Sequence, residues 1–452
     1  MSSSASSRDE NTLSGRVRRY AQVSTAMGGL AARYAGKRFL GMELSNDRYA
    51  GELKEALGGL KGPLMKVAQM MATIPDALPA EYAAELGQLQ SQAPPMGRPF
   101  VRRRMASELG SDWRQRFDSF DLEAAHAASL GQVHRATLHD GRPVACKLQY
   151  PNIASAVEAD LSQLQLIFSI YRRYDTAIDT REIYREIQAR LREELDYQRE
   201  AQNLGVYRYI HRNEPGVHVP EVVPELSTKR LLTMEWVDGR KILECKTLPV
   251  EDRNQIARHM FRAWYVPFYE YGIIHGDPHL GNYTVRDDLS INLLDFGCIR
   301  IFPASFVGGV IDLYNALVDG DRDLAVSAYE TWGFRDLDRE VIDILKEWAA
   351  FLYAPLMENR SRLIEETNSG QFGRQVAGRV HQKLKEAGGV APPREFVFME
   401  RAAIGLGSVF MHLNAELNWY EMFMELVEDF DRDQVAVRQK AALESQGLDV
   451  PA

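Results

Sequence analysis

The 452-residue sequence has little cysteine, no excess of positive charge and no long apolar run. Its three cysteines, Cys146, Cys245 and Cys298, show no regular spacing, which excludes a disulfide framework and indicates reduced intracellular thiols. A net charge of −9 argues against a nucleic-acid partner. With 45% hydrophobic and 26% charged residues, the composition is that of an ordinary globular protein.

Segments that would target or anchor the chain are not evident. The N-terminal residues lack the apolar stretch of a signal peptide. The longest uncharged runs, such as residues 402–415, fall short of the roughly 18–20 residues that cross a bilayer. We therefore expect a cytoplasmic protein without a transmembrane helix. Residues 16–39 mix basic and apolar side chains, so peripheral contact with the inner membrane is considered as well, although small apolar residues favour a packed helix there.

Hydrophobic periodicity divides the chain into four parts. A Ser-rich tail that we expect to be disordered is followed by a helical extension, a small α/β lobe with inserted helices, and a mainly helical lobe. The boundaries are residues 1–14, 15–95, 96–237 and 238–452. The fold class predicted from this order is α+β.

Individual elements follow from local patterns. Alternating residues around tight turns predict two β-hairpins and one further strand. Apolar residues at helical spacing predict helices before, between and after them. The hairpins are expected at 129–150 and 283–297, the strand at 230–237, and the helices at 153–174, 180–207, 250–272 and throughout the region after Pro303.

The polar stretch "IIHGDPHLGNY", residues 273–283, carries the strongest chemical signal. Asp277 and Asn282 are five residues apart, and Asp295 lies thirteen residues further on at the end of an apolar strand, before Phe296 and Gly297. Asp and Asn oxygens are hard ligands suited to Mg²⁺, and phosphoryl transfer needs Mg²⁺ and a carboxylate that orients the attacking oxygen. The pattern therefore predicts a kinase-type catalytic loop and metal-binding strand end.

The same stretch allows a second interpretation, in which His275 and His279 bind zinc. That site would need helical spacing and a third ligand. Pro278 and Gly281 argue against a helix through the loop. We therefore expect His275 to hold the loop in place.

Lys147, in "VACK", ends the first predicted hairpin and can point toward phosphates. A kinase-like arrangement requires a carboxylate from a helix to hold this lysine. The predicted helix around residues 192–203 offers Glu194, Asp196 and Glu200, and its turn would make Glu194 and Glu200 face different ways. Upstream, small residues in 124–136 stand where a glycine-rich phosphate loop would be expected.

Together these motifs resemble those of the UbiB/AarF-like atypical kinases, over about residues 25–330. "HGDPHLGN" resembles the catalytic loop of that family, "LLDFG" its metal-binding motif, "AHAAS" its alanine-rich loop and "ELDYQREA" its E-x-D motif. "KVAQ", residues 66–69, stands where the family has K-x-G-Q, and "MEWVDG" resembles the adenine-binding hinge. The resemblance implies a two-lobed, atypical protein-kinase-like fold with an N-terminal helical extension.

The resemblance also implies roles for individual residues. ATP and Mg²⁺ are the implied cofactors, and Lys66 and Gln69 are expected over the ATP site with Glu194 and Asp196. The implied catalytic residues are Asp277, Lys147 and Glu200; the implied metal ligands are Asn282 and Asp295; the implied nucleotide-binding residues are Ala127, Ala128, Ser129, Ala145, Lys147, Glu235 and Val237.

Two residues depart from the family pattern. Ala68 replaces the glycine of K-x-G-Q, and His126 replaces the first alanine of the alanine-rich loop. An alanine for glycine on a helix is a mild change, whereas His126 bears directly on the geometry of the nucleotide loop.

The predicted function is that of an ATP-binding atypical kinase or ATPase in ubiquinone or other quinone-lipid metabolism, with nucleotide and quinone-pathway lipids or proteins as partners. Two alternatives stay open: a small-molecule phosphotransferase of the aminoglycoside/choline kinase type, and a non-catalytic lipid-binding scaffold. A conventional protein kinase is disfavoured, because no activation loop or A-P-E motif follows "DFGCIRIFPASF".

Overall fold

A computed structural model describes residues 96–450 of the chain. The gaps within this range are residues 129, 152, 175, 336 and 367–370. Internal contacts divide the chain into two units, Met1–Ala93 and Pro94–Ala452, and everything described below belongs to the second unit.

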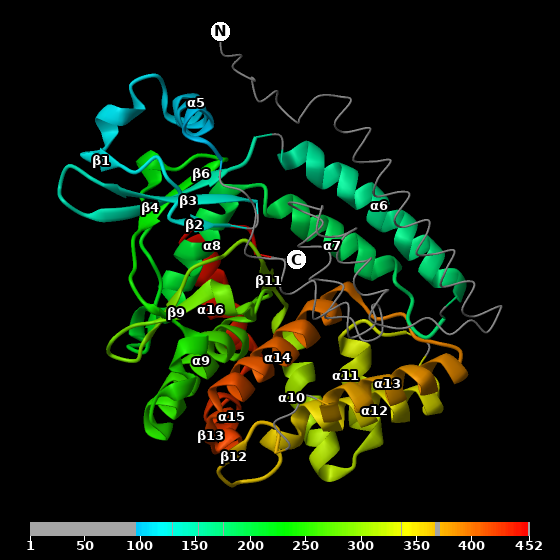
Figure 1. The fold of residues 1–452 in the computed structure, drawn as a ribbon. Coiled ribbons are helices and arrows are strands. Elements are labelled where there is room, and N and C mark those ends of the chain that lie inside the picture. The colour runs from blue at the N-terminus through cyan, green and yellow to red at the C-terminus, as the bar shows by residue number, and fades with distance from the viewer. Residues whose placement is uncertain are drawn as a thin grey trace. The chain divides into compact units, whose positions relative to one another are not determined.

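The small lobe is an antiparallel five-stranded sheet in the order β1-β3-β4-β6, with β2 paired to the other end of β3 (Figure 1). The sheet is preceded by helix α5. The predicted hairpin and the predicted strand are both confirmed, because β3 pairs with β4 and β4 with β6. The bounds are α5 Arg98–Leu109, β1 Ser119–Phe120, β2 His126–Ala127, β3 Gly131–Thr137, β4 Pro143–Gln149 and β6 Leu231–Glu235.

Strand β4 shows how the sheet separates two environments. Successive side chains of a strand point to opposite faces. Val144, Cys146 and Leu148 pack in a core with residues of α5, whereas Ala145 belongs to the main core of the molecule. Lys147 shares the face of Ala145, so its charge is directed away from α5 and toward the large lobe.

Three helices follow the hairpin, α6 (Ile153–Tyr174), α7 (Arg181–Glu193) and α8 (Tyr197–Ile210). The prediction of one helix over 180–207 is wrong, because the chain breaks after α7 and Asp196 begins a new helix. The Asp196 carboxylate accepts hydrogen bonds from the backbone N–H groups of Gln198 and Arg199 at 3.1 and 3.3 Å. The break reorients Glu194 relative to α8, so their relation is not that of residues on one continuous helix.

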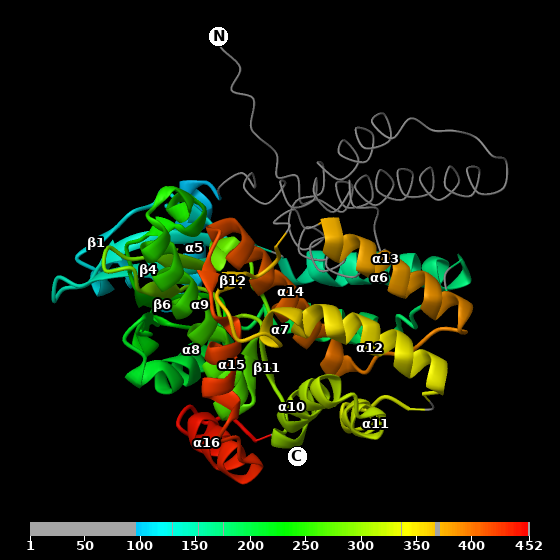
Figure 2. The same cartoon turned by 90° about the horizontal axis from the view of Figure 1, so that it is seen from below.

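The large lobe is built around α9, which is buried along much of its length and contributes to the main core. Predicted helix 250–272 and hairpin 283–297 are confirmed as α9 and the β9–β10 pair. Figure 2 shows helices α10 to α14 on one side of this core. The helices are α9 Val250–Tyr271, α10 Ala304–Asp319, α11 Arg322–Thr331, α12 Arg339–Tyr353, α13 Gln371–Glu386, α14 Arg394–Leu413, α15 Trp419–Val427 and α16 Arg432–Glu444.

Short strands connect the helices of the large lobe. One sheet has the order β5-β10-β9-β7, and β11 pairs with β8 and β12 with β13. Strands β8 and β11 flank the loop and the turn that carry the predicted catalytic motifs. The bounds are β5 Val217–His218, β7 Arg240–Lys241, β8 Ile273–His275, β9 Tyr283–Val285, β10 Ile291–Leu293, β11 Ile299–Ile301, β12 Arg362–Leu363 and β13 Glu416–Leu417.

A buried carboxylate docks α7 onto the large lobe. Glu186 is fully buried and contacts Arg190 of the same helix at 3.0 Å. It also contacts Arg300 of β11 at 3.0 Å and Arg394 of α14 at 2.6 Å. Since a buried charge needs close partners, this cluster fixes α7 beside the turn that follows Asp295.

All three cysteines are buried, and none of them forms a disulfide. No helix among residues 96–450 is both long enough and apolar enough to span a bilayer.

The Asp196 cap provides a test of the break before α8. Replacing Asp196 with Ala should lower the free energy of unfolding by about 1 kcal/mol, because two backbone N–H groups at the start of α8 lose their acceptor. Asp196→Ser keeps an acceptor at this position and should cost less. Urea unfolding followed by circular dichroism measures both changes, and equal losses for Ala and Ser would contradict the capping role.

Candidate functional site

The β9–β10 hairpin brings Asn282 and Asp295 together. Tyr283 of β9 pairs with Leu293 of β10, so Asn282 just before β9 lies opposite Leu294 just after β10. The Leu294 N–H donates to the Asn282 carbonyl at 2.9 Å. Asp295 is the next residue, and the two predicted metal ligands thus lie at the base of one hairpin.

Asp277 joins this pair through the Asn282 side chain. The Asn282 Nδ2 donates to the Asp277 backbone carbonyl at 3.0 Å and to its Oδ2 at 3.1 Å. Asp277 is buried. The Tyr283 hydroxyl donates to the Pro278 carbonyl at 2.8 Å, which holds the loop against β9. Asp277, Asn282 and Asp295, separated by eighteen residues in sequence, therefore form one polar cluster.

His275 holds the catalytic loop in place through contacts with its backbone, as expected from the sequence. Its Nδ1 accepts a hydrogen bond from the Asp277 N–H at 3.2 Å, and its Nε2 contacts the Asp295 carbonyl. Both ring nitrogens thus lie against the backbone of the site. The Nδ1 of His279 accepts from the Gly281 N–H at 3.0 Å.

Lys147 of β4 reaches the same cluster from the small lobe. Its Nζ lies 2.6 Å from Glu200 Oε1 of α8 and 3.1 Å from Asp295 Oδ2. Of the three carboxylates that the sequence offered as partners of Lys147, Glu200 is therefore the one that contacts its ammonium. The ammonium also lies 5.2 Å from the centre of the Tyr197 ring, within the range of a cation–π contact.

Burial and the neighbouring charge shift the pKa values of Glu200 and Lys147 in opposite directions. Burial raises the pKa of the Glu200 carboxyl to about 7, and the Lys147 ammonium opposes that shift. For Lys147, burial lowers the pKa, but the carboxylates of Asp295 and Glu200 outweigh burial and raise it well above its usual value. Lys147 is therefore held as a cation, which is the form that can contact a phosphate.

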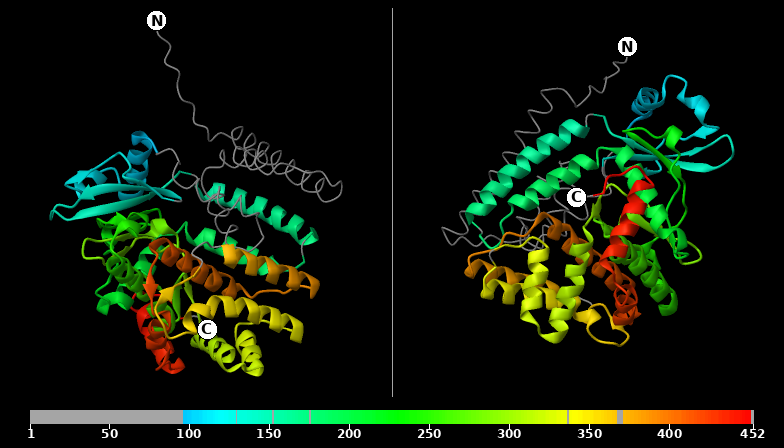
Figure 3. Two further views of the ribbon diagram at one scale, coloured as in Figure 1. Left: turned by 60° about the horizontal axis from the view of Figure 1, so that its bottom comes forward. Right: turned by 180° about the vertical axis from the view of Figure 1, so that it is seen from behind.

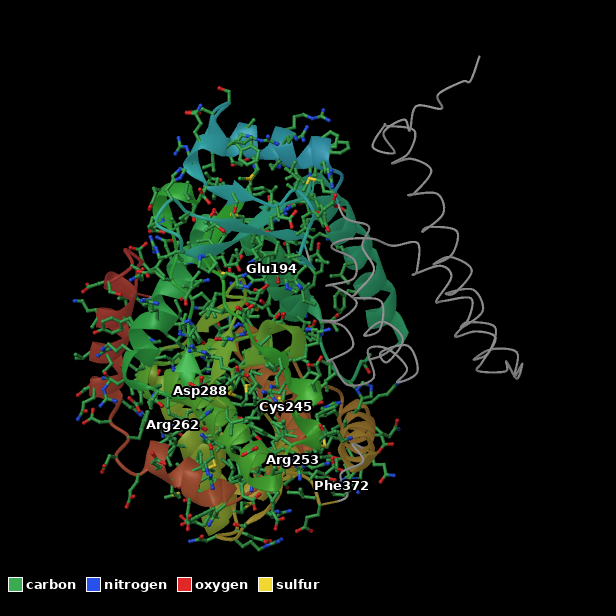
Figure 4. The ribbon with its side chains drawn as sticks, turned by 60° about the vertical axis from the view of Figure 1, so that its left-hand side comes forward. Glu194, Cys245, Arg253, Arg262, Asp288 and Phe372 are labelled. Carbon is green, nitrogen blue, oxygen red and sulfur yellow. The ribbon has the colours of Figure 1, made fainter. Side chains whose placement is uncertain are left out.

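Glu194 and Asp196 of the E-x-D motif lie in different surroundings. Glu194 is buried, and its Cγ would lie 3.3 Å from a Cβ atom placed on Gly297, directly after Asp295 and Phe296. In Figure 4 Glu194 lies next to the sheet of the small lobe, whereas Asp288, in the turn of the β9–β10 hairpin, lies further from that sheet. The Asp196 carboxylate instead caps α8 and lies 3.5 Å from Lys229.

Residues His126 and Ala127 of the alanine-rich loop form the short strand β2, which the sequence did not predict. Ala127 ends β2, and the Ala128 N–H donates to the Gly131 carbonyl at 2.9 Å. His126, the departure from the family pattern, stacks on Trp236 with ring centres 5.9 Å apart and an interplanar angle of 22°. The loop is thus linked by aromatic contact to the segment that connects the lobes.

The predicted adenine-binding residues lie on that segment and on β4. Glu235 ends β6, where its N–H donates to the Glu221 carbonyl at 2.8 Å. Val237 follows at a half-buried position, and Ala145 is buried on the face of the sheet that carries Lys147. Ser129, Lys66 and Gln69 are outside the described residues, so their expected places at the site stay predictions.

Asn203 is a site residue that the sequence reasoning missed. Its Nδ2 donates to the carbonyl of Phe296 at 2.9 Å, and both residues are buried. Asn203 lies three residues after Glu200, and residues at this spacing share a helix face. That spacing was the signal that could have identified it.

Comparison with known proteins agrees with this geometry. Residues 88–329 match the family described as the ABC1 atypical kinase-like domain, which is more than half of the chain. The chain belongs to this family. The predicted UbiB/AarF-like resemblance and the kinase-like α+β fold are thereby confirmed.

Curated relatives of this ABC1 atypical kinase-like protein include kinases of animals and plants. Atypical kinase COQ8B, mitochondrial, of Rattus norvegicus is 27% identical over 387 residues, covering 83% of this chain and 71% of the relative. Protein ACTIVITY OF BC1 COMPLEX KINASE 7, chloroplastic, of Arabidopsis thaliana is 32% identical over 276 residues, but the match spans only 40% of that protein and 60% of this chain.

A solved structure supports the kinase-like fold of this chain. The Mycobacterium tuberculosis protein Rv3197, determined in complex with erythromycin, superposes with a TM-score of 0.56 at 26% identity. The match covers 84% of this chain and 96% of the mycobacterial chain.

The Lys147–Glu200 contact predicts strong energetic coupling. Lys147→Met and Glu200→Leu should each lower the free energy of unfolding by about 3 kcal/mol, because each leaves a buried charge without this partner. The double variant should cost at least about 1 kcal/mol less than the sum of the two.

Urea denaturation of the four proteins measures this coupling. The exposed pair Arg322–Asp343, with a nitrogen–oxygen distance of 3.0 Å, is the matched control and should show coupling below about 1 kcal/mol. Additive effects at Lys147 and Glu200 would contradict the proposed strength of the buried contact.

Proposed function

We propose that this chain binds ATP with Mg²⁺ between its lobes and acts as an atypical kinase or ATPase. The observation that carries the proposal is the convergence of charges at Asp295. Lys147 from the small lobe contacts Asp295 and Glu200, while Asn282 beside Asp295 contacts Asp277. A buried lysine, two hard-oxygen ligands and a second carboxylate are the parts that phosphoryl transfer requires.

The donors at the base of the β9–β10 hairpin fit Mg²⁺. Asp295 supplies a carboxylate, and Asn282 supplies an amide oxygen; both are the hard ligands that Mg²⁺ prefers. The Asp295 side chain is one-quarter exposed, so it is accessible to an ion. Asp295 and Asn282 would hold the ion, which when bound neutralises the charge of the phosphate oxygens.

The other residues of the cluster would bind and orient the reactants. Lys147 would contact the phosphates, with Glu200 holding its ammonium in place. Asp277 would orient the acceptor oxygen and take its proton, which is the role of a carboxylate in this position. Ala145, Glu235 and Val237 would line the adenine end, and the alanine-rich loop would cover the phosphates.

We further propose a role in quinone-lipid metabolism, with peripheral contact to a membrane. The membrane contact rests on the mixed basic and apolar side chains of residues 16–39, and the role in quinone-lipid metabolism rests on the family resemblance. It accords with the rat relative being named an atypical kinase of mitochondria.

Substitutions of the two aspartates test the proposed function. Asp295→Asn should weaken Mg–ATP binding at least about tenfold, because a charged metal ligand is lost. Asp277→Asn should leave Mg–ATP affinity within about twofold and reduce phosphate release or transfer at least about a hundredfold. Thermal-shift titration with and without EDTA measures affinity, and a coupled phosphate assay measures turnover.

The two variants distinguish the candidate functions. Loss of turnover with retained binding in Asp277→Asn supports an enzyme. If wild-type protein binds Mg–ATP but no acceptor or water reacts, the non-catalytic scaffold is supported instead. Unchanged Mg–ATP affinity in Asp295→Asn would contradict the metal-ligand assignment.

The contact between His126 and Trp236 predicts a second effect on the nucleotide. His126→Ala removes a stacked pair worth about 0.5–1.5 kcal/mol, and nucleotide dissociation should become about two- to tenfold faster. His126→Phe keeps an aromatic ring and should retain a rate near that of wild type. Stopped-flow displacement of a fluorescent ATP analogue measures the rates, and equal acceleration in Ala and Phe would mean that stacking is not the cause.

A further inference from the structure

The C-terminal segment, residues 432–448, packs against the helix that carries Glu200. It consists of α16 and the turn after it, and it lies beyond residues 88–329 that match the family. Figure 3 shows this segment in red alongside the green helices, and contacts of α16 with both α8 and α9 confirm the arrangement. The segment thus bridges elements that flank the site.

One end of the C-terminal segment is fastened to the large lobe. The Arg432 guanidinium lies 2.9 Å from the Asp312 carboxylate of α10. Further along, the buried Gln439 side chain donates to the carbonyls of Tyr271 and Phe302, both at 2.8 Å. These carbonyls lie at the end of α9 and just after β11, so α16 has a fixed position on the large lobe.

The other end of the segment touches α8. Gln202 Nε2 donates to the Gln446 carbonyl at 3.2 Å. The Gln446 side chain lies against Gly205, where an added Cβ would meet its Oε1 at 2.0 Å. Gly447 adopts a left-handed conformation with φ of 65°, and the buried Leu448 follows, so the turn holds Gln446 in place.

Helix α8 therefore makes contacts on two opposite faces. Glu200 and Asn203, three residues apart, contact Lys147 and the Phe296 carbonyl. At 100° per residue, Gln202 and Gly205 lie on roughly the opposite side of the helix. The helix is held between the charge cluster on one side and the C-terminal segment on the other.

We propose that the C-terminal segment positions α8, and that Gly205 and Gln446 are positioning residues for the Lys147–Glu200 contact. The proposal rests on the function proposed above, because nucleotide affinity is one of its readouts. Since α16 is fixed to the large lobe, it sets the distance between α8 and the catalytic loop. It does so independently of the segment after β6 that connects the two lobes. Displacing Gln446 lets α8 move and weakens the hold of Glu200 on Lys147.

Gly205→Ala is the first test. The new methyl group displaces the flexible Gln446 side chain, and a groove of about 1170 Å³ lined by Gln202, Gly205 and Gln446 among others gives that side chain room to move. Alanine also favours the helical conformation, so the variant should fold. We expect Mg–ATP affinity to fall about fivefold, together with faster hydrogen exchange at the α8 amides.

A second variant on the same contact keeps the test independent of folding. Gln446→Ala should weaken Mg–ATP affinity by a similar factor. In Gly205→Ala/Gln446→Ala the methyl group occupies space that the glutamine has left, and affinity should recover to within about twofold of wild type. Gln434→Ala, at an exposed glutamine of α16 in the same C-terminal segment, is the matched control and should leave affinity unchanged.

A Lys147→Ala background separates positioning from a general structural effect. If α8 acts through the Lys147–Glu200 contact, Gly205→Ala should weaken residual Mg–ATP affinity less than about twofold in that background. A full fivefold loss of Mg–ATP affinity in the Lys147→Ala background would overturn the proposal. So would unchanged Mg–ATP affinity together with unchanged hydrogen exchange of the α8 amides in both single variants. If the wild-type protein binds no Mg–ATP, the proposed function fails. The positioning role is then judged by hydrogen exchange, and an unchanged exchange rate of the α8 amides in Gln446→Ala would refute it.

Discussion

The buried positive charge of Lys147 is the constraint on which the site depends. An ammonium group removed from water is costly unless carboxylates lie close to it. Glu200 at 2.6 Å and Asp295 at 3.1 Å meet this need from two different elements. One comes from α8 and the other from the turn after β10, so satisfying one charge brings three separate segments of the chain to one point.

The surrounding fold holds those three segments in fixed positions relative to one another. The sheet directs Lys147 away from α5, and the β9–β10 pairing places Asp295 next to the residue opposite Asn282. His275 contacts the backbone of both Asp277 and Asp295. Glu186 and its arginine partners secure α7 beside the same turn, so the charged site is surrounded by contacts that leave its geometry little freedom.

Elements with a clear local pattern could be predicted from the sequence. Both hairpins were recognised because alternating residues flank turns rich in Asp and Gly, and helix α9 because its apolar spacing ends at Gly272. The break between α7 and α8 was missed because Glu194, Leu195 and Asp196 do not interrupt helical periodicity. Only the tertiary structure, in which Asp196 caps α8, shows it.

The residues of the site also fall into those that could be predicted from the sequence and those that could not. Asp277, Asn282 and Asp295 belong to short motifs whose residues are close in sequence, and the lysine could be matched to a nearby acidic helix. Asn203 and Gln446 have no such motif, because their partners, Phe296 and Gln202, are distant in the chain. The strand β2 was missed because two residues are too few to show alternation.

The two ends of the β9–β10 hairpin lie in different surroundings. Asn282 and Asp295 lie at its base, while the turn of residues 286–290 lies at the other end, where Asp287 is fully exposed. Because the strand pairing sets the position of the base, added length in the turn would project into solvent without shifting either of these residues. That turn is therefore the place at which a spectroscopic reporter could be inserted within a few residues of the site while leaving the positions of Asn282 and Asp295 intact.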